Sequence, residues 1–266
     1  MSAWSAVYGI VARDLTRTTR QTSRLLGGVA RPFMWLLLVG TGYNAIARLE
    51  GGIPYQAYVF PGVVVMAALF GGMLTAVSTV YDREFGMLRL MLASPAGPAA
   101  VLLGRVLAAS LVGLLQGGIV LAVAPLVVPI TDERWLLALG VLAAVAAMSA
   151  TLGLLVAARL RSVENFAGII NVILFPLLFL SGALYPTGGM PAALRALARL
   201  NPVTYAVDLL RHAFGQAGEL ALATDVAVVV AVTLVGFAAG TLLFDPEQRF
   251  TARGPRRAED TASASA

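Results

Sequence analysis

Few side chains in this 266-residue chain could do chemistry, and the missing types exclude whole classes of site. All nineteen basic residues are arginines, and because a Walker A phosphate loop needs a lysine, the chain has no standard ATP site. No cysteine is present, which excludes disulfides, thiolate metal sites and a cysteine nucleophile. The single histidine, His212, argues against a histidine-based metal site. We therefore expect no metal, no catalytic residue and no cofactor on this chain.

The long apolar runs contain no Asp, Glu, Lys, Arg or His. These runs are 51–81, 106–131, 135–158, 165–194 and 226–244. Ion-coupled carriers usually place ionisable groups at mid-membrane, and acid–base enzymes need a pair of them. Their absence argues against a carrier, a channel with a charged filter and a membrane enzyme. Gln116 and Asn171 are the notable polar residues in the runs, and they either hydrogen-bond between helices or contact a substrate in a pathway.

Residues 80–105 interrupt these runs with charges. Asp82, Arg83, Glu84 and Arg89 fall within eight residues, so the chain leaves the membrane here and then returns. The segment is nevertheless too apolar for a solvated loop. Its apolar side chains would cover most of a short helix: Phe85, Met87, Leu88, Leu90, Met91 and Leu92. Such a helix either lies on the lipid surface or docks into another protein.

The composition predicts an all-α, polytopic membrane helix bundle to position these residues. The chain is 59% hydrophobic and 12% charged, whereas a soluble domain carries roughly 25% charge. A span needs about 20 apolar residues. Six spans are predicted within a transmembrane domain at 25–244, at about 25–47, 57–79, 102–129, 135–158, 165–184 and 225–244. Gly113–Gly117 and Gly236–Gly240 have the spacing of close helix contacts, which predicts packing.

Two segments flank the spans. Residues 1–24 carry apolar side chains on one helical face and arginines on the other, which predicts an N-terminal helix in the membrane interface. A plainly solvated basic face is the alternative. Residues 245–266 carry four arginines and then small polar residues, and we expect a disordered cytoplasmic tail.

Residues 185–221, here called the outer segment, are neither a span nor a simple loop. Pro186, Pro191 and Pro202 divide them into two short helical patterns, each too short to cross a membrane. In the second pattern Asp208 can pair with Arg211 or His212. We expect short re-entrant or interfacial helices between spans five and six.

The distribution of arginine predicts the orientation. If the N-terminus is inside, fourteen of the nineteen arginines lie on inner segments. Positive residues accumulate on the cytoplasmic side, so both termini should be cytoplasmic, in an inner (plasma) membrane. The net charge of +5 then marks span edges rather than a nucleic-acid partner.

Two stretches in this order resemble the permease subunit of type-2 ABC exporters, the group that includes daunorubicin-resistance and nodulation-factor export permeases. The first is REFGMLRLMLASP at 83–95. The second, at 175–214, runs from an apolar span through SGALYP and a short helix to NPVTYAVDLLR. The resemblance covers essentially the whole chain.

The resemblance implies a pair of permease subunits bound to two cytoplasmic ABC ATPase subunits, which hold ATP and Mg²⁺. Residues 80–100, here called the coupling segment, would sit in a cleft of the ATPase through Arg83, Glu84, Phe85, Gly86, Leu88, Arg89 and Leu92. A second cytoplasmic contact would comprise Arg159, Arg161 and Glu164. Re-entrant outer helices would carry Pro186, Pro191, Arg195, Arg199, Asn201, Pro202, Asp208 and Arg211.

The expected function is ATP-driven export of a lipophilic or amphiphilic substrate, such as a drug, a metabolite or a lipid-linked glycan. The apolar spans favour such a cargo, while the outward direction follows from the resemblance alone. The alternatives are a non-transport membrane scaffold that has kept the fold and, less favoured, a lipid-modifying membrane enzyme. The outer arginines would contact either lipid headgroups or substrate.

Overall fold

The computed structural model describes residues 3–44, 54–92, 94–126, 128, 134–160 and 162–244. Every regular element within these residues is a helix, which confirms the all-α prediction. Arg161, the tail at 245–266 and the side chain of Asn171 lie outside the described part of the chain.

The helices follow one another with short connections. Their bounds are α1 Ala3–Arg20, α2 Thr22–Met34, the π-helix η1 Trp35–Gly40, α3 Thr41–Asn44, α4 Tyr55–Thr75, α5 Val77–Glu84, α6 Met87–Leu92, α7 Pro98–Val123, the 3₁₀ turn η2 Ala124–Leu126, α8 Trp135–Arg159, α9 Val163–Phe179, the 3₁₀ turn η3 Thr187–Gly189, α10 Ala192–Leu200, α11 Pro202–Ala213 and α12 Leu222–Phe244.

Five stretches among the described residues are long and apolar enough to cross a membrane. They are Leu25–Tyr43, Tyr55–Glu84, Pro98–Val123, Trp135–Arg159 and Leu222–Phe244. The remaining predicted span corresponds to α9, an apolar helix of 17 residues, at the lower end of the length that spans a bilayer (about 17–25 residues). The polytopic membrane bundle is therefore confirmed, with α9 as its shortest member.

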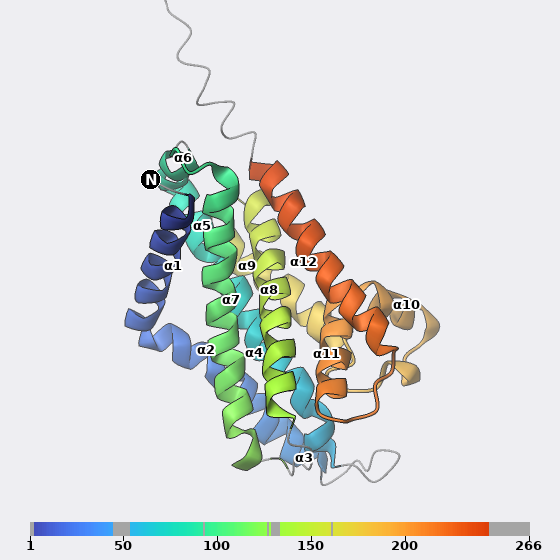
Figure 1. The fold of residues 1–266 in the computed structure, drawn as a ribbon. Helices are drawn as coiled ribbons and strands as arrows, with labels where there is room; N and C mark the ends of the chain where they lie inside the picture. Colours follow the sequence, from blue (N-terminus) through green and yellow to red (C-terminus); the bar gives the residue numbers. More distant parts are fainter. Residues whose placement is uncertain are drawn as a thin grey trace, which may run out of the picture.

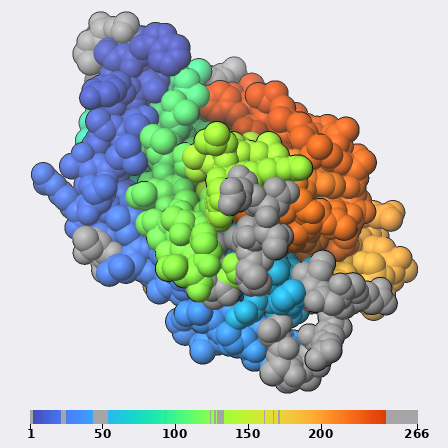
Figure 2. Space-filling model, turned by 60° about the horizontal axis from the view of Figure 1, so that its bottom comes forward, coloured from blue at the N-terminus to red at the C-terminus, as the bar shows by residue number. Residues whose placement is uncertain are grey.

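Helix α4 forms the centre of the bundle. Its residues are apolar on every side, as expected of a helix surrounded by protein, and Val64, Leu69 and Phe70 are among its buried side chains. It contacts α2, α7, α8 and α11. Figure 2 shows the outer order across one face: blue α1 and α2, green α7, yellow-green α8 and orange α12.

The long helices alternate in direction, so the connecting segments collect at two ends. Figure 1 shows α1, α6 and the last turns of α12 towards one end, and α3 with the first turns of α4 and α8 towards the other. The N-terminal, coupling and 159–164 segments, which the arginine distribution groups together, thus share an end.

The two glycine pairs lie at helix contacts, which confirms their predicted role in packing. A Cβ atom on Gly113 would lie 2.9 Å from the Ala68 carbonyl oxygen, and one on Gly117 would lie 2.7 Å from Leu142 Cδ1. A Cβ atom on Gly236 would lie 2.8 Å from Thr151 Cγ2. Glycine at these positions lets α7 approach α4 and α8, and lets α12 approach α8.

We predict that Gly113→Ala lowers the free energy of unfolding by about 1–3 kcal/mol, because the added methyl group meets the backbone of α4. The matched control is Gly118→Ala on the same helix, where a Cβ atom has no other heavy atom within 4 Å. This control should be neutral or slightly stabilising. Thermal unfolding of both purified variants measures the difference. Equal stability of the two would contradict close contact at Gly113.

Candidate coupling surface and outer helices

The coupling segment is a tight turn between two helices. Helix α5 ends at Glu84, α6 begins at Met87, and Gly86 between them has a φ of +77°. A side chain at this φ would be strained, so glycine permits the turn. Two residues thus separate α5 from α6, which lies as a short helix at the end of the bundle (Figure 1).

The turn divides the apolar side chains of the segment into two sets. Leu88 and Leu92 are buried in a small core with Ile10 of α1 and Leu102 of α7. Phe85, Met87 and Leu90 point outward, and the side chains of Phe85 and Leu90 are 63% and 70% exposed. Glu84 and Arg89 are also exposed. Of the residues predicted to face a partner, Leu88 and Leu92 instead fix the segment to the bundle.

Arg83 binds the end of a neighbouring helix. Its Nη1 atom donates to the carbonyl oxygens of Ala157, Ala158 and Leu160, at 2.7, 3.2 and 2.7 Å. Its guanidinium lies over the ring of Phe244, 4.7 Å from the centroid. A cation at the C-terminus of α8 satisfies carbonyls that have no partner within the helix and complements the helix dipole.

Glu84 binds the start of the next helix. Its Oε2 atom accepts from the backbone N–H of Val163, the first residue of α9, at 3.0 Å. A carboxylate at a helix N-terminus is electrostatically favoured. Arg83 and Glu84 thus connect α5 to both sides of the loop between α8 and α9. The two predicted cytoplasmic contacts therefore form one surface, on which Arg159 and Glu164 are exposed.

We predict that Arg83→Gln lowers the free energy of unfolding by about 2 kcal/mol, because hydrogen bonds from a charged donor to the α8 terminus are lost. Arg89→Gln on exposed α6 is the matched control and should change stability by less than about 0.5 kcal/mol. Denaturation in detergent measures both. If the two variants are equally stable, the contact between Arg83 and α8 contributes nothing.

A buried charge cluster lies beneath the coupling segment. Arg105 Nη1 donates to Asp14 Oδ2 at 3.3 Å and to Ser78 Oγ at 3.3 Å, and Arg105 Nη2 pairs with Asp82 Oδ2. Arg13 Nη2 lies 3.0 Å from Asp14 Oδ1 and 2.9 Å from Asp82 Oδ2. The cluster joins α1, α5 and α7. Asp82, grouped above with the charges that leave the membrane, is instead buried.

The cluster explains how α1 is oriented. The buried stripe of α1 is Val7, Ile10, Asp14 and Thr18, and it packs against α7. Trp4 and Tyr8, two of the apolar residues of the predicted N-terminal helix, are instead 74% and 76% exposed. Hydrophobic periodicity did not predict that Asp14 is buried, because it assigns only apolar residues to the buried face. The available signal was a single acidic residue on an otherwise basic helix.

The outer segment forms two short helices, as predicted, and α11 is the buried one. Asn201 caps α11: its Oδ1 accepts from the Val203 N–H at 3.0 Å, and its Nδ2 donates to the Leu177 carbonyl oxygen at 2.6 Å. Pro202 occupies the first helical position, where its fixed φ is favourable. This cap also ties α11 to the end of α9.

Arg211 holds the neighbouring loops against α11. Its Nη2 donates to the Gly182 carbonyl oxygen at 2.5 Å, its Nη1 lies 3.3 Å from Glu219 Oε1, and its guanidinium lies 4.4 Å from the Tyr58 ring centroid. Asp208 Oδ1 lies 3.7 Å from Arg211 Nη1, so the predicted pairing with Arg211 is present. Asp208 Oδ2 lies 3.8 Å from His212 Nε2, which pairs with it only when the imidazole is protonated.

The remaining outer residues lie nearer the surface. Arg195 Nη2 donates to the carbonyl oxygens of Gly188 and Met190, at 2.6 and 2.9 Å, and so holds η3 against α10. Arg199, Pro186 and Pro191 are exposed. Of the three outer arginines, Arg199 is therefore the one whose side chain faces away from the protein.

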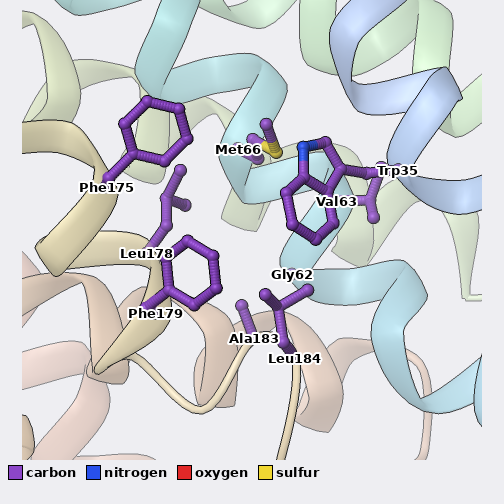
Figure 3. Close-up of a pocket in the computed structure, with 9 residues that line it drawn as sticks. All are labelled: Trp35, Gly62, Val63, Met66, Phe175, Leu178, Phe179, Ala183 and Leu184. Carbon is purple, nitrogen blue, oxygen red and sulfur yellow. The ribbon is translucent and has the colours of Figure 1, made fainter. Parts of the chain in front are cut away.

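An apolar pocket opens between η1, α4 and α9 (Figure 3). Its nine lining residues are all apolar: Trp35, Gly62, Val63, Met66, Phe175, Leu178, Phe179, Ala183 and Leu184. Trp35 and Phe179 meet edge to face, with ring centroids 5.9 Å apart. Of the predicted pathway residues, Gln116 does not line this pocket; it is buried against Gly28 and Gly71. Asn171 belongs to α9, which lines it.

Comparison with known proteins identifies the family of this chain. The ABC-2 type transporter family matches residues 5–214. The transport permease ycf38 of Cyanophora paradoxa is 26% identical over 229 residues, which cover 80% of this chain and 76% of that protein. Nodulation protein J of Rhizobium leguminosarum bv. trifolii is 29% identical over 193 residues, covering 70% of this chain and 72% of that protein. With its membrane bundle, capped coupling turn and outer helices, this chain belongs to the ABC-2 type transporter family, as a transport permease subunit.

Proposed function

We propose that this permease is the membrane-spanning part of an ATP-driven exporter, in which two copies of the chain bind two cytoplasmic ABC ATPase subunits. The observation that carries the proposal is the exposure of three apolar side chains, Phe85, Met87 and Leu90. They lie on a turn that the buried side chains of Leu88 and Leu92 fix to the bundle. Exposed apolar side chains next to the charges of Glu84 and Arg89 suit a cleft in a soluble partner. ATP and Mg²⁺ belong to that partner, since this chain has no lysine for a phosphate loop.

The contacts of the coupling segment supply a route for mechanical work. Arg83 and Glu84 at the end of α5 bind the end of α8 and the start of α9, so a displacement of α6 that moves the end of α5 acts on both helices. Helix α9 carries Phe175 and Phe179 on one wall of the apolar pocket. Movement of the ATPase would thus change the pocket, as coupling through packed elements requires.

The apolar lining of this small pocket supports a substrate class. Nine apolar residues and an aromatic pair favour a lipophilic or amphiphilic molecule, such as a drug, a metabolite or the lipid part of a lipid-linked glycan. The outer face would carry α10 and α11. The end of the bundle with α1, α6 and the last turns of α12 would face the cytoplasm, in an inner (plasma) membrane.

Co-reconstitution tests the function. The chain is purified with its ABC ATPase, placed in proteoliposomes and assayed for ATP turnover and for movement of a panel of lipophilic compounds. Trp35→Ala should raise the KM for the transported compound at least about threefold while leaving basal ATP turnover unchanged, because it alters the pocket and not the coupling surface. Absence of an ATPase complex would favour a membrane scaffold. A complex that hydrolyses ATP and moves no compound in the panel would reject the lipophilic substrate class.

Labelling tests the orientation. Because the chain has no cysteine, single variants Leu90→Cys and Arg199→Cys each give one exposed thiol. In intact cells, a membrane-impermeant maleimide should label Arg199→Cys alone. The opposite result would invert the topology.

A further inference from the structure

Three potential metal ligands converge where α11 meets the start of α12. Asp208 and His212 lie one turn apart on α11, and Asp225 lies in the first turn of α12. His212 Nε2 is 3.8 Å from Asp208 Oδ2 and 3.5 Å from Asp225 Oδ2. All three ligand atoms lie within 4.8 Å of one another. Residues up to 17 positions apart in sequence thus form one compact group.

Asp225 is the most deeply buried member of this group. Its side chain is 0% exposed, and neither carboxylate oxygen has a hydrogen-bond partner among the described residues. Burying a carboxylate without a partner is costly, so such groups are usually paired or bound to a metal. The nearest cationic group is His212, which is charged only when protonated. A divalent cation between the three side chains would satisfy Asp225.

The surroundings hold the ligands in place. Asp208 accepts from the backbone N–H groups of Glu219 and Leu220, both at 2.8 Å, and Arg211 pairs with its Oδ1 atom. Hydrogen bonds of this kind fix the direction of a metal-binding carboxylate. The Leu220 carbonyl oxygen lies 3.1 Å from His212 Nε2 and could serve as a fourth, oxygen ligand. Metal binding through Nε2 would place the imidazole proton on Nδ1.

The spacing suits a small transition-metal ion. Ligand atoms around a tetrahedral Zn²⁺ ion, with bonds of about 2.0–2.2 Å, lie roughly 3.3–3.6 Å apart. The two separations from His212 are close to this range, so small side-chain rotations would complete the geometry. A groove between α8, α11 and α12 reaches His212 and provides an entry path.

We propose that Asp208, His212 and Asp225 bind one divalent transition-metal ion, Zn²⁺ by ligand type, and that this ion clasps α11 to α12. One imidazole nitrogen with carboxylate oxygens favours such ions over Ca²⁺ or Mg²⁺, which prefer all-oxygen sites. The proposal does not depend on export, on an ATPase or on a substrate. The proposal assigns a role to His212. In the sequence, the presence of only one histidine had argued against a metal site.

The experiment uses the full-length chain purified in detergent, stripped with EDTA and titrated with Zn²⁺. We expect elemental analysis after dialysis to find about one Zn²⁺ per chain, and the Tm to rise on addition of Zn²⁺. With Co²⁺ in place of Zn²⁺, we expect a visible d–d absorption band typical of a metal site of low symmetry. Asp225→Asn and His212→Gln should each weaken Zn²⁺ binding at least about tenfold. Asp225→Asn is the main variant, because Asp225 has no hydrogen bond to lose.

Glu219→Gln is the matched control, since Glu219 lies in the same region and pairs with Arg211 and Thr187. It should bind Zn²⁺ as the unaltered chain does. The metal site is supported if the unaltered chain and the Glu219→Gln control bind Zn²⁺ stoichiometrically and both ligand variants lose this binding. Absence of stoichiometric binding, or equal affinity in Asp225→Asn and the unaltered chain, overturns it.

Discussion

Replacement of Arg105 by methionine should lower the free energy of unfolding by about 3–5 kcal/mol, the cost typical of breaking a buried ion pair from one side. Arg105 is almost fully buried and lies between Asp14 and Asp82. Without the guanidinium, two buried carboxylates face each other with only Arg13 nearby. We expect a large fall in Tm and reduced accumulation in the membrane, measured by thermal unfolding and by fluorescence-detected size exclusion.

Arg13→Met serves as the control for Arg105. The Arg13 side chain is 41% exposed and contacts the same two carboxylates. Exposed ion pairs contribute about 1 kcal/mol or less, so this variant should be much the milder. Equal destabilisation by the two replacements would mean that burial does not set the strength of the cluster.

A rescue experiment separates charge from packing. Asp14→Asn and Asp82→Asn, added to Arg105→Met, remove the uncompensated charges and should restore most of the lost stability, because an uncharged cluster avoids the desolvation cost. Failure of the rescue would show that the arginine acts through its shape and contacts. Those include Met91 Sδ, at 3.5 Å from Arg105 Nη2, which connects the cluster to α6.

Replacement of Leu90 by glutamate should lower ATP turnover of the proposed complex at least about tenfold without unfolding the chain. Leu90 is 70% exposed on α6, so the substitution places a charge where the proposed ATPase cleft would bury an apolar side chain. Hot-spot contacts of this kind contribute about 2 kcal/mol or more, which corresponds to more than tenfold in affinity. Co-purification, ATP turnover and Tm are measured together.

Leu200→Glu is the matched control, since Leu200 is 80% exposed on α10 in the outer segment. It should leave ATP turnover unchanged. If Leu90→Glu reduces lipid binding of the isolated chain and keeps full ATPase activity, α6 is a lipid-surface helix. Crosslinking from Leu90→Cys to the ATPase gives an independent test, and position 90 suits it because Leu88 is buried.

Both predictions concern the end of the bundle where α1, α5, α6 and α7 meet. The buried cluster holds this end together, and the turn above it presents the surface proposed to meet the ATPase. A variant of Arg105 should therefore affect stability and coupling together. A variant of Leu90 should affect coupling alone. This difference distinguishes the buried cluster, which supports the surface, from the exposed surface of α6 proposed to bind the ATPase.

The sequence alone determined the fold class and the approximate limits of most helices. Apolar runs of span length can satisfy their backbone only as helices in a membrane, so composition was sufficient. It also determined that the outer segment holds two short helices, because Pro186, Pro191 and Pro202 divide it into short helical patterns. Both rules depend on residues that are neighbours in the chain.

Tertiary structure alone decided which side chains are buried and what the charged ones bind. Leu88 and Leu90 have the same hydrophobicity and lie two residues apart, yet one is buried against α1 and α7 and the other is exposed. Asp82 pairs with Arg105, 23 residues on, while Arg83 binds α8 some 75 residues away. Asp225 joins His212 only because α11 and α12 meet. Such pairings depend on how helices pack in three dimensions, which periodicity and charge counts along the chain do not contain.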